Sequence, residues 1–467
     1  MTKQIGKTMT NLLPERGKTV LLINPWIYDF AAYDFWIKPM GLMMLGAILR
    51  ENGFHVLAID CLNTAHETIN PRPDTIRRTS MGTGKFPKIF VPQPDIPGNF
   101  SRRYGRYGIS IAAFQKNLHR IPKPDMVFVT SMMTYWYPGV FEAIRQVKNV
   151  FPRVPVVAGG HYVTLCPDHA RHSGADILIS GPGEKDLGQL CHTLLHEDLS
   201  FLPDLDDLNT YPYPAFDLLP ENTQIPILTS RGCPFNCTYC ASHLLHPFFL
   251  RRDPYKVVKE IEFWYTRHGV IHFAFYDDAL LSKPEDMFIP MAQELLERKL
   301  PCRLHCPNGL HLREVTEEIA TLMFKAGFHT IRFGFETSDA KRQRDTGKKV
   351  TNHDLEEAVF HLREAGYKAN DIGIYILCGL PGQSIEEVRE SINYVHLCGA
   401  TPIVAEYSPI PGTTLWDEAV ISSPFPIENE PFFHNNTLLP CQSEKLTYGM
   451  YRQLKAQLHN QKGKDAS

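Results

Sequence analysis

Two series of strand–helix alternation constrain the fold of this 467-residue chain. In the first series, apolar stretches rich in β-branched residues predict buried strands at 18–24, 55–59, 126–130, 154–157 and 177–180. Amphipathic stretches between them predict helices at 41–51, 137–150 and 185–195. Strands that alternate with such helices are typical of a parallel sheet covered on both faces. The pattern predicts an α/β domain with a doubly wound, Rossmann-like sheet over residues 1–200.

The second series predicts six strands, at 225–229, 272–276, 302–305, 330–335, 373–378 and 403–407, with helices between them. Six consecutive βα units indicate a partial (β/α)6 barrel over 226–415, related to the eight-unit TIM barrel. The acidic, proline-bearing stretch 201–225 is the predicted linker. Residues 416–467 form a predicted C-terminal extension, which ends in an amphipathic helix over 443–461 and a polar tail.

Residues 64–122 do not fit the first series. They are rich in proline, glycine, arginine and aromatic residues, and they are too many for an idle loop in a compact domain. We interpret them as a functional insertion over the ligand face of the sheet. A solvated or partner-binding loop is the alternative.

Charge and cysteine content narrow the function classes. The 48 Lys and Arg residues against 51 Asp and Glu leave a net charge of −3, which requires neither a nucleic acid nor a membrane as partner. The longest apolar run near the N-terminus, 39–49, is too short to span a bilayer, and no signal-peptide pattern precedes it. We therefore expect a cytoplasmic protein, whose eleven cysteines are thiols or metal ligands rather than disulfides.

The most informative motif is a loop with the spacing Cys-x3-Cys-x2-Cys, directly after the first strand of the second series. It contains Cys233, Cys237 and Cys240, and Tyr239 precedes the third cysteine. Three thiolates suit a soft metal, and an iron–sulfur cluster held by only three keeps one iron open for a substrate or cofactor. A zinc site completed by His243 or His246 is the alternative, although a strand-to-loop context is not that of a zinc knuckle.

This loop resembles that of the radical SAM superfamily. The resemblance implies a 4Fe–4S cluster on the three cysteines, with the fourth iron chelated by S-adenosylmethionine (SAM). Such enzymes cleave SAM reductively to a 5′-deoxyadenosyl radical. Further motifs at predicted strand ends, at 276–278, 333–338, 378–383 and 407–413, match the superfamily in order. The resemblance implies SAM-binding roles for Tyr239, Asp277, Asp278, Glu336, Ser338, Gly379 and Pro411.

Structural roles compete with some of these assignments. Asp277 and Asp278 can neutralise the SAM ammonium, but one of them can equally cap a helix. Glu336 can accept ribose hydroxyls or serve as a buried structural carboxylate. Cys302 and Cys306 flank His305 as a second metal site would require, but thiols at a strand end are more often part of the core.

Small and hydroxyl-bearing residues follow four predicted strands of the first series. They allow a flat or phosphate-bearing ligand to approach the backbone, although tight turns and helix caps use the same residues. A domain of this kind in front of a radical SAM domain resembles the cobalamin-binding domain. The resemblance implies that cobalamin contacts Asn24, Thr130, Ser131, Gly159, Gly160, Thr164, Gly181, Gly183 and Glu184.

One departure affects the cobalamin prediction. The chain lacks the Asp-x-His-x-x-Gly string whose histidine ligates cobalt in corrinoid proteins of the methionine synthase type. The resemblance therefore predicts cobalamin bound without a histidine lower ligand, or a domain that has kept the fold and lost the cofactor.

The resemblance as a whole implies a cobalamin-dependent radical SAM enzyme that methylates an unactivated carbon. It also implies a small-molecule substrate and an external one-electron reductant of the flavodoxin or ferredoxin type. A radical rearrangement or cyclisation without methyl transfer is the first alternative, and a redox- or corrinoid-responsive binding protein is the second. Methylthiolation of transfer RNA is disfavoured, because the N-terminal half has no second three-cysteine motif. No residue is assigned a catalytic role.

Overall fold

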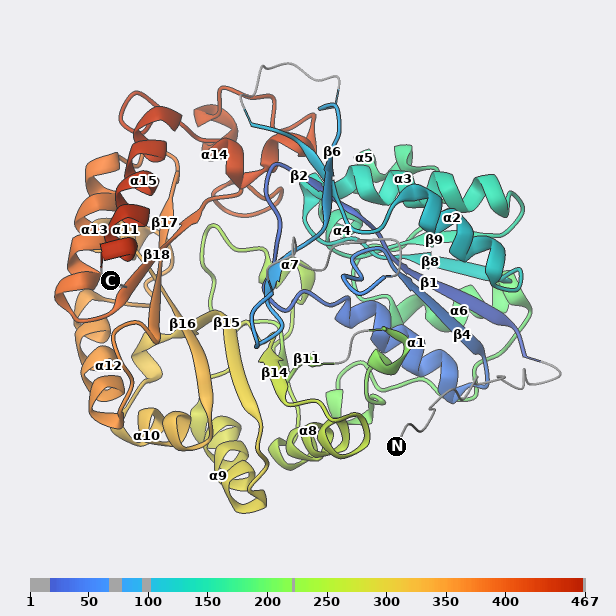
Figure 1. Cartoon of the computed structure of the whole chain (residues 1–467), viewed down its shortest axis with the longest axis horizontal. Helices are drawn as coiled ribbons and strands as arrows, with labels where there is room; N and C mark the ends of the chain where they lie inside the picture. The colour runs from blue at the N-terminus through green and yellow to red at the C-terminus, as the bar shows by residue number, and fades with distance from the viewer. Residues whose placement is uncertain (1–16, 67–77, 95–101, 221–222, 465–467) are drawn as a thin grey trace, which may run out of the picture.

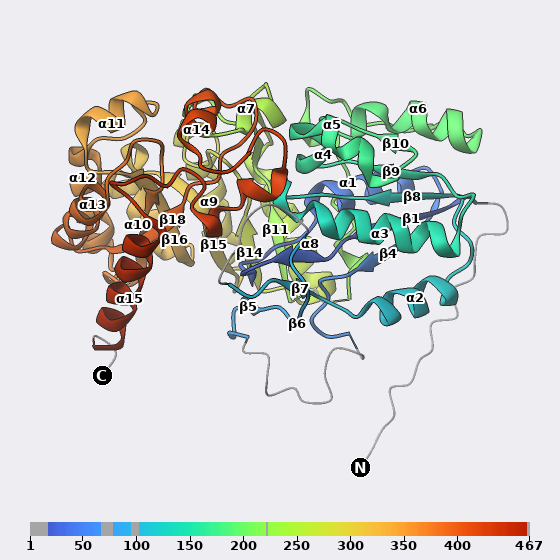
Figure 2. The same ribbon diagram turned by 90° about the horizontal axis from the view of Figure 1, so that it is seen from above.

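The computed structural model describes residues 17–66, 78–94, 102–220 and 223–464, with side chains to 458. Two parallel sheets lie side by side, each flanked by its own helices (Figures 1 and 2). The first has the order β10-β9-β8-β1-β4. Its strands are β1 (Thr19–Asn24), β4 (His55–Asp60), β8 (Met126–Val129), β9 (Val156–Ala158) and β10 (Ile177–Leu178). The doubly wound sheet predicted from the sequence is therefore confirmed.

Alternating residues of β1 bury opposite faces of this sheet. Val20 and Leu22 pack in the core that contains α1 (Met40–Glu51) and α6 (Glu184–Leu195). Leu21 and Ile23 pack in the core that contains α2 (Ile111–Arg120) and α3 (Tyr137–Val150). The uninterrupted apolar run over residues 20–23 is what a strand with two covered faces requires. The short helices α4 (His161–Leu165) and α5 (Pro167–Ala170) follow β9.

The second sheet is parallel throughout, with the order β11-β14-β15-β16-β17-β18. Its strands are β11 (Gln224–Ile227), β14 (His272–Phe275), β15 (Arg303–His311), β16 (Phe328–Glu336), β17 (Ile372–Cys378) and β18 (Thr401–Glu406). The helices between them are α7 (Ser242–Leu245), α8 (Pro254–His268), α9 (Phe288–Arg298), α10 (Glu317–Lys325), α11 (Ala340–Asp345), α12 (Asn352–Ala365) and α13 (Ile385–Leu397). Since β11 and β18 are edges that do not pair with each other, the barrel is partial, as predicted.

The C-terminal residues connect the two sheets. They form α14 (Trp416–Ser422), a 3-10 turn over Pro431–His434, and α15 (Tyr448–Lys464). Asn435 Nδ2 donates to the buried Asp29 at 2.9 Å, and His434 Nδ1 lies 3.0 Å from Thr134 Oγ1. In the described chain, no helix combines the length and the apolar character that a membrane span needs.

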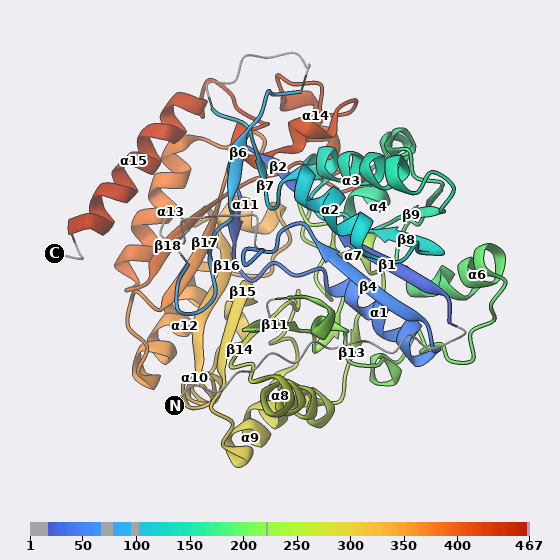
Figure 3. The same cartoon turned by 45° about the vertical axis from the view of Figure 1, so that its right-hand side comes forward.

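The described part of the insertion forms β5 (Gly84–Lys85), β6 (Lys88–Phe90), β7 (Gly105–Tyr107) and α2. Strand β7 pairs with β6 and with β2 (Ile27–Asp29), and β5 pairs with β3 (Tyr33–Asp34). These strands lie beside the C-terminal residues (Figure 3), where the rings of Tyr104 and Phe432 are 5.6 Å apart. Residues 67–77 and 95–101 lie outside the described part.

The insertion also reaches the barrel. Trp36 donates its Nε1 hydrogen to Met81 O at 2.9 Å, and its ring stacks on His305 of β15 at 4.2 Å. None of its described residues lines the cavity at the carboxyl ends of the first sheet. For the described residues the expectation that the insertion covers that ligand face is therefore wrong, because β5, β6 and β7 pair with one another or with β2 and β3, and α2 packs in the core with α3.

Candidate functional site

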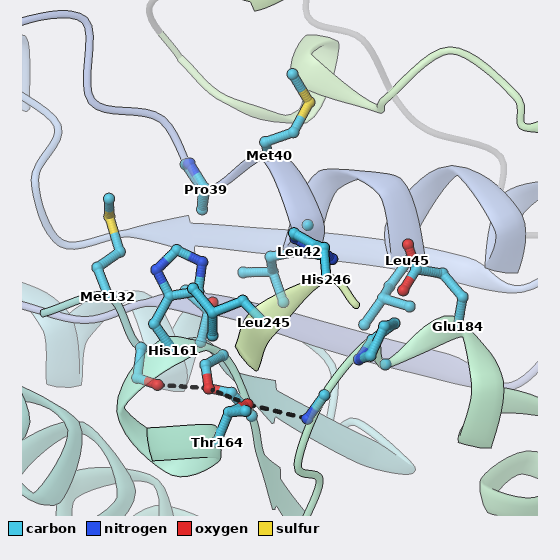
Figure 4. Close-up of a pocket in the computed structure, with 18 of the residues that line it drawn as sticks. Pro39, Met40, Leu42, Leu45, Met132, His161, Thr164, Glu184, Leu245 and His246 are labelled. Atoms are coloured by element: carbon cyan, nitrogen blue, oxygen red, sulfur yellow. Dashed lines mark hydrogen bonds between the residues drawn. The ribbon is translucent and has the colours of Figure 1, made fainter. Parts of the chain in front are cut away.

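A cavity of about 450 Å³ separates the carboxyl ends of the first sheet from the cysteine loop (Figure 4). Leu42 and Leu45 of α1 contribute apolar surface, and Ser230, Cys240 and Asp278 belong to the barrel side. Eight of the nine predicted cobalamin-contacting residues line it: Thr130, Ser131, Gly159, Gly160, Thr164, Gly181, Gly183 and Glu184. The ninth, Asn24, is not among the lining residues, and its Nδ2 donates to Asp60 at 2.8 Å.

Hydrogen bonds join the strand-end loops on the first-sheet side of the cavity. Ser131 Oγ donates a hydrogen bond to Gly159 O at 2.7 Å. Thr164 Oγ1 donates to Gly160 O and accepts from Gly181 N, both at 2.9 Å. Gly160 has a φ of 97°, and an added Cβ would overlap the Ser131 carbonyl oxygen. Only glycine therefore permits this close approach of the loops.

Two histidines from different domains line the same cavity (Figure 4). His161 begins α4, and His246 follows α7. Burial lowers the pKa of His161, and it lowers the pKa of His246 to about 4. Both rings are thus neutral near pH 7, and His246 Nδ1 is buried without a hydrogen-bond partner in the described chain. From the sequence, His246 is proposed only as an alternative zinc ligand. His161 is given no role, although His161 directly follows the Gly159-Gly160 pair.

A buried ion pair joins the two sides of the cavity. Arg231 Nη2 lies 2.9 Å from Glu184 Oε1, with the two side chains 11% and 6% exposed. The guanidinium also lies over the Tyr211 ring at 5.2 Å. Glu184 begins α6, and Arg231 ends β12 (Ser230–Arg231), two residues before Cys233. No local pattern in the sequence indicates this contact between residues 47 positions apart.

The cysteine loop presents three unpaired thiols. Cys233 and Cys240 are partly exposed, and Cys237 is 7% exposed. In the described chain, no three His, Cys, Asp or Glu side chains are arranged to hold a single metal ion. Three thiols in one loop at the mouth of a barrel are instead the donor set of an iron–sulfur cluster. The loop is held by β12, which pairs with β13 (Leu250–Arg251), and by Phe235, which stacks on His311 at 4.3 Å.

Tyr239, Glu336 and Lys349 form a polar group beside this loop. Glu336 Oε1 accepts from Tyr239 Oη at 3.0 Å and from Lys349 Nζ at 2.7 Å. Burial lowers the pKa of Lys349, but Glu336, Tyr239 and Cys237 together outweigh this effect and hold that pKa well above its usual value. A Cβ on Gly334 would lie 2.8 Å from Glu336 Oε1 and 2.9 Å from Lys349 Nζ, so this group needs glycine there. Lys349 was missed because no motif contains it.

The two predicted carboxylates of 277–278 have different surroundings. Asp277 accepts hydrogen bonds from the backbone nitrogen and the hydroxyl of both Thr229 and Ser230, at 2.6–3.1 Å. Its oxygens are therefore occupied in fixing the turn before the cysteine loop. Asp278 accepts from Ser242 Oγ and lines the cavity. Burial raises the pKa of both carboxyl groups.

The remaining predicted SAM residues lie at or beyond the carboxyl ends of the last three strands. Ser338 N donates to Ser391 Oγ at 2.9 Å, and Gly379 N, at a φ of 94°, donates to Gln383 Oε1 at 2.8 Å. Pro411 is partly buried in the loop after β18. Of these three residues, none lines the cavity.

Cys302 and Cys306 are packed in the hydrophobic core of the barrel. His305, between them, lies 2.9 Å from His272 and 3.0 Å from Thr330 through its ring nitrogens. The core interpretation of the two thiols is confirmed.

Comparison with known families matches both halves of the chain. The model of the radical SAM superfamily matches residues 227–395, and that of the B12 binding domain matches residues 108–190. The chain belongs to the radical SAM enzymes that carry a B12-binding domain. The two domains imply a 4Fe–4S cluster, SAM and cobalamin as its cofactors.

Several curated proteins are similar to this radical SAM enzyme. The uncharacterized methyltransferase PH0819 of Pyrococcus horikoshii is 26% identical over 64% of the chain and 70% of that protein. The cytidylyl-2-hydroxyethylphosphonate methyltransferase of Streptomyces wedmorensis is 27% identical over 90% and 84%. An anaerobic magnesium-protoporphyrin IX monomethyl ester cyclase of Cereibacter sphaeroides is 25% identical over 63% of the chain, and the match spans about half, 53%, of that protein.

Solved structures share the fold of the enzyme. The radical SAM methyltransferase TsrM from Kitasatospora setae, with cobalamin and a [4Fe-4S] cluster bound, superposes with a TM-score of 0.64 at 17% identity, over 88% of this chain and 76% of that one. The cobalamin-dependent radical enzyme OxsB, with aqua-cobalamin and SAM, gives 0.55 at 15% identity, over 96% and 62%. The predicted fold class, a Rossmann-like domain followed by a partial barrel, is confirmed.

Proposed function

We propose that this enzyme is a cobalamin-dependent methyltransferase that acts on a carbon atom of a small molecule. The observation that carries the proposal is the shared cavity, which brings the strand-end loops of the B12-binding domain against Cys240 and Asp278 of the barrel. Two cofactors, SAM and cobalamin, that must react with the same substrate need such a common space. Methyltransferases that match 64% and 90% of the chain support the same activity.

Each side of the cavity has a distinct task in this proposal. Cys233, Cys237 and Cys240 hold the cluster, and SAM lies along the barrel rim among Tyr239, Asp278, Glu336, Ser338, Gly379 and Pro411. The loops of Thr130, Ser131, Gly159, Gly160, Thr164, Gly181, Gly183 and Glu184 hold cobalamin. When bound, these groups supply the electron, the hydrogen-abstracting radical and the methyl group. Asp277 positions the loop, because its oxygens are filled by Thr229 and Ser230.

The chain's own residues bind, orient and exclude water. The Glu336 carboxyl group is fixed by hydrogen bonds from Tyr239 and Lys349, so its oxygens are positioned to accept hydrogen bonds from hydroxyl groups. Leu42, Leu45 and the neutral His161 and His246 add no charge near pH 7 to the cavity wall. An external one-electron reductant, of the flavodoxin or ferredoxin type, completes the system.

The test is anaerobic purification with cobalamin supplied, followed by iron and cobalt quantitation and turnover with SAM deuterated in its methyl group. We expect about four irons and one cobalt per chain, and a product in which one CD₃ group replaces a hydrogen atom of the substrate. SAM cleavage without retained cobalt, or product without the label, contradicts methyl transfer. A C237A variant, which lacks one thiol ligand, is the control for cluster-independent turnover.

A radical cyclisation without methyl transfer is a second candidate, because the magnesium-protoporphyrin ester cyclases match 63% of the chain. The same experiment separates the two reactions. A cyclisation changes the product by loss of hydrogen and leaves the methyl label on SAM or its fragments. The binding-protein alternative predicts no SAM turnover at all.

A further inference from the structure

One column of side chains on β16 faces the interior of the barrel. Successive residues of a strand point to opposite sides, so Thr330, Arg332 and Gly334 share one face. The residues between them, Ile331 and Phe333, are fully buried in the hydrophobic core with the surrounding helices. In register, Thr330 lies beside His305, Arg332 beside Gly373, and Gly334 beside Tyr375.

The other positions of this interior face have partners. Thr330 Oγ1 lies 3.0 Å from His305 Nδ1, and Tyr375 Oη donates to Pro307 O at 2.8 Å, across β16. Gly334 is covered by the ion pair of Glu336 and Lys349. With these contacts, no charged group of the described chain lacks a counter-ion at the positions of Thr330 and Gly334.

Arg332 differs from its neighbours. Its guanidinium is partly buried and donates to the adjacent Ile331 O at 3.1 Å, and in the described chain no carboxylate lies within ion-pair distance of it. The Asp371 carboxylate influences the Arg332 guanidinium electrostatically but forms no ion pair with it. Asp371 Oδ2 instead accepts a hydrogen bond from Lys368 N at 2.8 Å. Burial lowers the pKa of Arg332.

Gly373 creates the space for this side chain. A Cβ there would overlap Arg332 Nη1 and would lie 2.6 Å from its Cδ. The guanidinium thus lies flat on the strand β17, toward the interior. Two strand residues span about 7 Å, so Arg332 is roughly that far below Gly334 and its covering ion pair.

A partly buried cation without a counter-ion destabilises a fold unless something binds it. Lys349, one level higher on the same face, has its counter-ion in Glu336 at 2.7 Å. We propose that the counter-ion of Arg332 is an oxyanion of the substrate, a carboxylate or a phosphate-type group, bound inside the barrel beneath the Glu336–Lys349 pair. The planar fork of arginine matches both kinds of group with two hydrogen bonds.

That Arg332 binds an oxyanion does not depend on the proposed function. Only the assignment of this oxyanion to the substrate rests on the proposed function. It makes the enzyme specific for anionic small molecules. The charged end lies at Arg332, and the reacting carbon points toward the barrel rim. A neutral substrate would leave the guanidinium unpaired in every state of the enzyme.

The test measures the melting temperature of the cluster- and cobalamin-loaded full-length enzyme as sodium phosphate or sodium acetate replaces sodium chloride at constant ionic strength. We expect a saturable rise for wild type and for R267M, which removes an exposed arginine on α8. We expect no rise for R332M, whose melting temperature without oxyanion equals or exceeds that of wild type. The stronger of the two anions identifies the charged group as phosphate-type or carboxylate.

Two further variants keep the test decisive if R332M does not fold. R332K retains the charge but loses the fork, so the half-saturating anion concentration should rise about tenfold. G373A should displace the guanidinium and weaken binding similarly. An anion response that is absent in wild type or retained in R332M overturns the inference, and so does anion binding by R332K and G373A that is as tight as that of wild type. None of these readouts depends on methyl transfer, so failure of the proposed function is seen separately.

Discussion

The two sides of the cavity are built from opposite kinds of residue. On the B12-binding side, glycines and hydroxyl groups such as Gly160, Ser131 and Thr164 satisfy one another by hydrogen bonds, and the Glu184 carboxylate is paired with Arg231. On the barrel side, the exposed Asp278 lines the cavity, and the ion pair of Glu336 and Lys349 lies largely buried beside the cysteine loop, outside the cavity wall. The first side can select a ligand by shape and close backbone approach, and the second by electrostatics.

This difference suits the two cofactors. Cobalamin is bulky and needs room against backbone, whereas the methionine end of SAM is a zwitterion that needs paired charges. A change on one side should therefore affect one cofactor and leave the other bound. The four predictions that follow test this separation.

The largest effect is expected from C237A. Loss of one of three thiol ligands removes the cluster, so iron should fall to background and SAM cleavage should stop. Cobalt content should stay near that of wild type, because Cys237 does not line the cavity. Metal analysis of both elements is the measurement, and C398A, at a partly exposed thiol after α13, is the control. Joint loss of iron and cobalt would show that the sides are not independent.

The reverse effect is expected from G160A. The added methyl group meets the Ser131 carbonyl oxygen at a φ of 97°, which costs about 1–3 kcal/mol and lowers cobalamin affinity by tenfold to a hundredfold. Cobalt content after gel filtration should fall while iron remains. G174A is a matched control, since Gly174 also has a positive φ, 80°, but only an ordinary contact around its Cα and no place in the cavity wall. Equal loss in both variants would assign the effect to backbone strain alone.

An effect shared by both sides is expected from E184Q. It leaves the buried Arg231 guanidinium without its counter-ion, which destabilises the fold by about 3 kcal/mol. The melting temperature and the retention of both cofactors should fall together, unlike in the first two variants. E197Q, at an exposed position after α6, should change neither. An unchanged melting temperature in E184Q would mean that the two sides are not joined by this ion pair.

The sequence predicted what local periodicity encodes. All eleven predicted strands appear in the structure, because each is a short apolar run ended by a turn signal. Strand β15 was predicted to end at 305 but runs to His311. Pro307, Asn308 and Gly309 resemble a loop, and the register shift between Cys306 and Leu310 accommodates them.

Most of the candidate site followed from strand ends, since residues at one edge of a parallel sheet converge wherever the strands lie in the chain. What could not be predicted depends on packing between distant elements. Lys349 meets Glu336, and Arg231 meets Glu184, only after both sheets have formed. The position of Trp36 between His305 of the barrel and Met81 of the insertion likewise depends on contacts between distant segments, for which no local pattern exists.

The smallest expected effect concerns His246 and the acid stability of the cavity. Burial lowers its pKa from 6.5 to about 4, so between these values the unfolded chain binds a proton that the folded chain does not. The contribution is therefore fully present above pH 6.5 and is lost as the pH falls toward 4, at up to about 1.4 kcal/mol per pH unit. In H246N, the drop in melting temperature from pH 7 to pH 5 should be smaller than in wild type, whereas H353N, at an exposed position on α12, should match wild type. Because each variant is compared with wild type at the same pH, acid loss of the cluster cancels. An identical drop in H246N and wild type would show that the ring takes up a proton in the folded cavity, so that this wall is not neutral in acid.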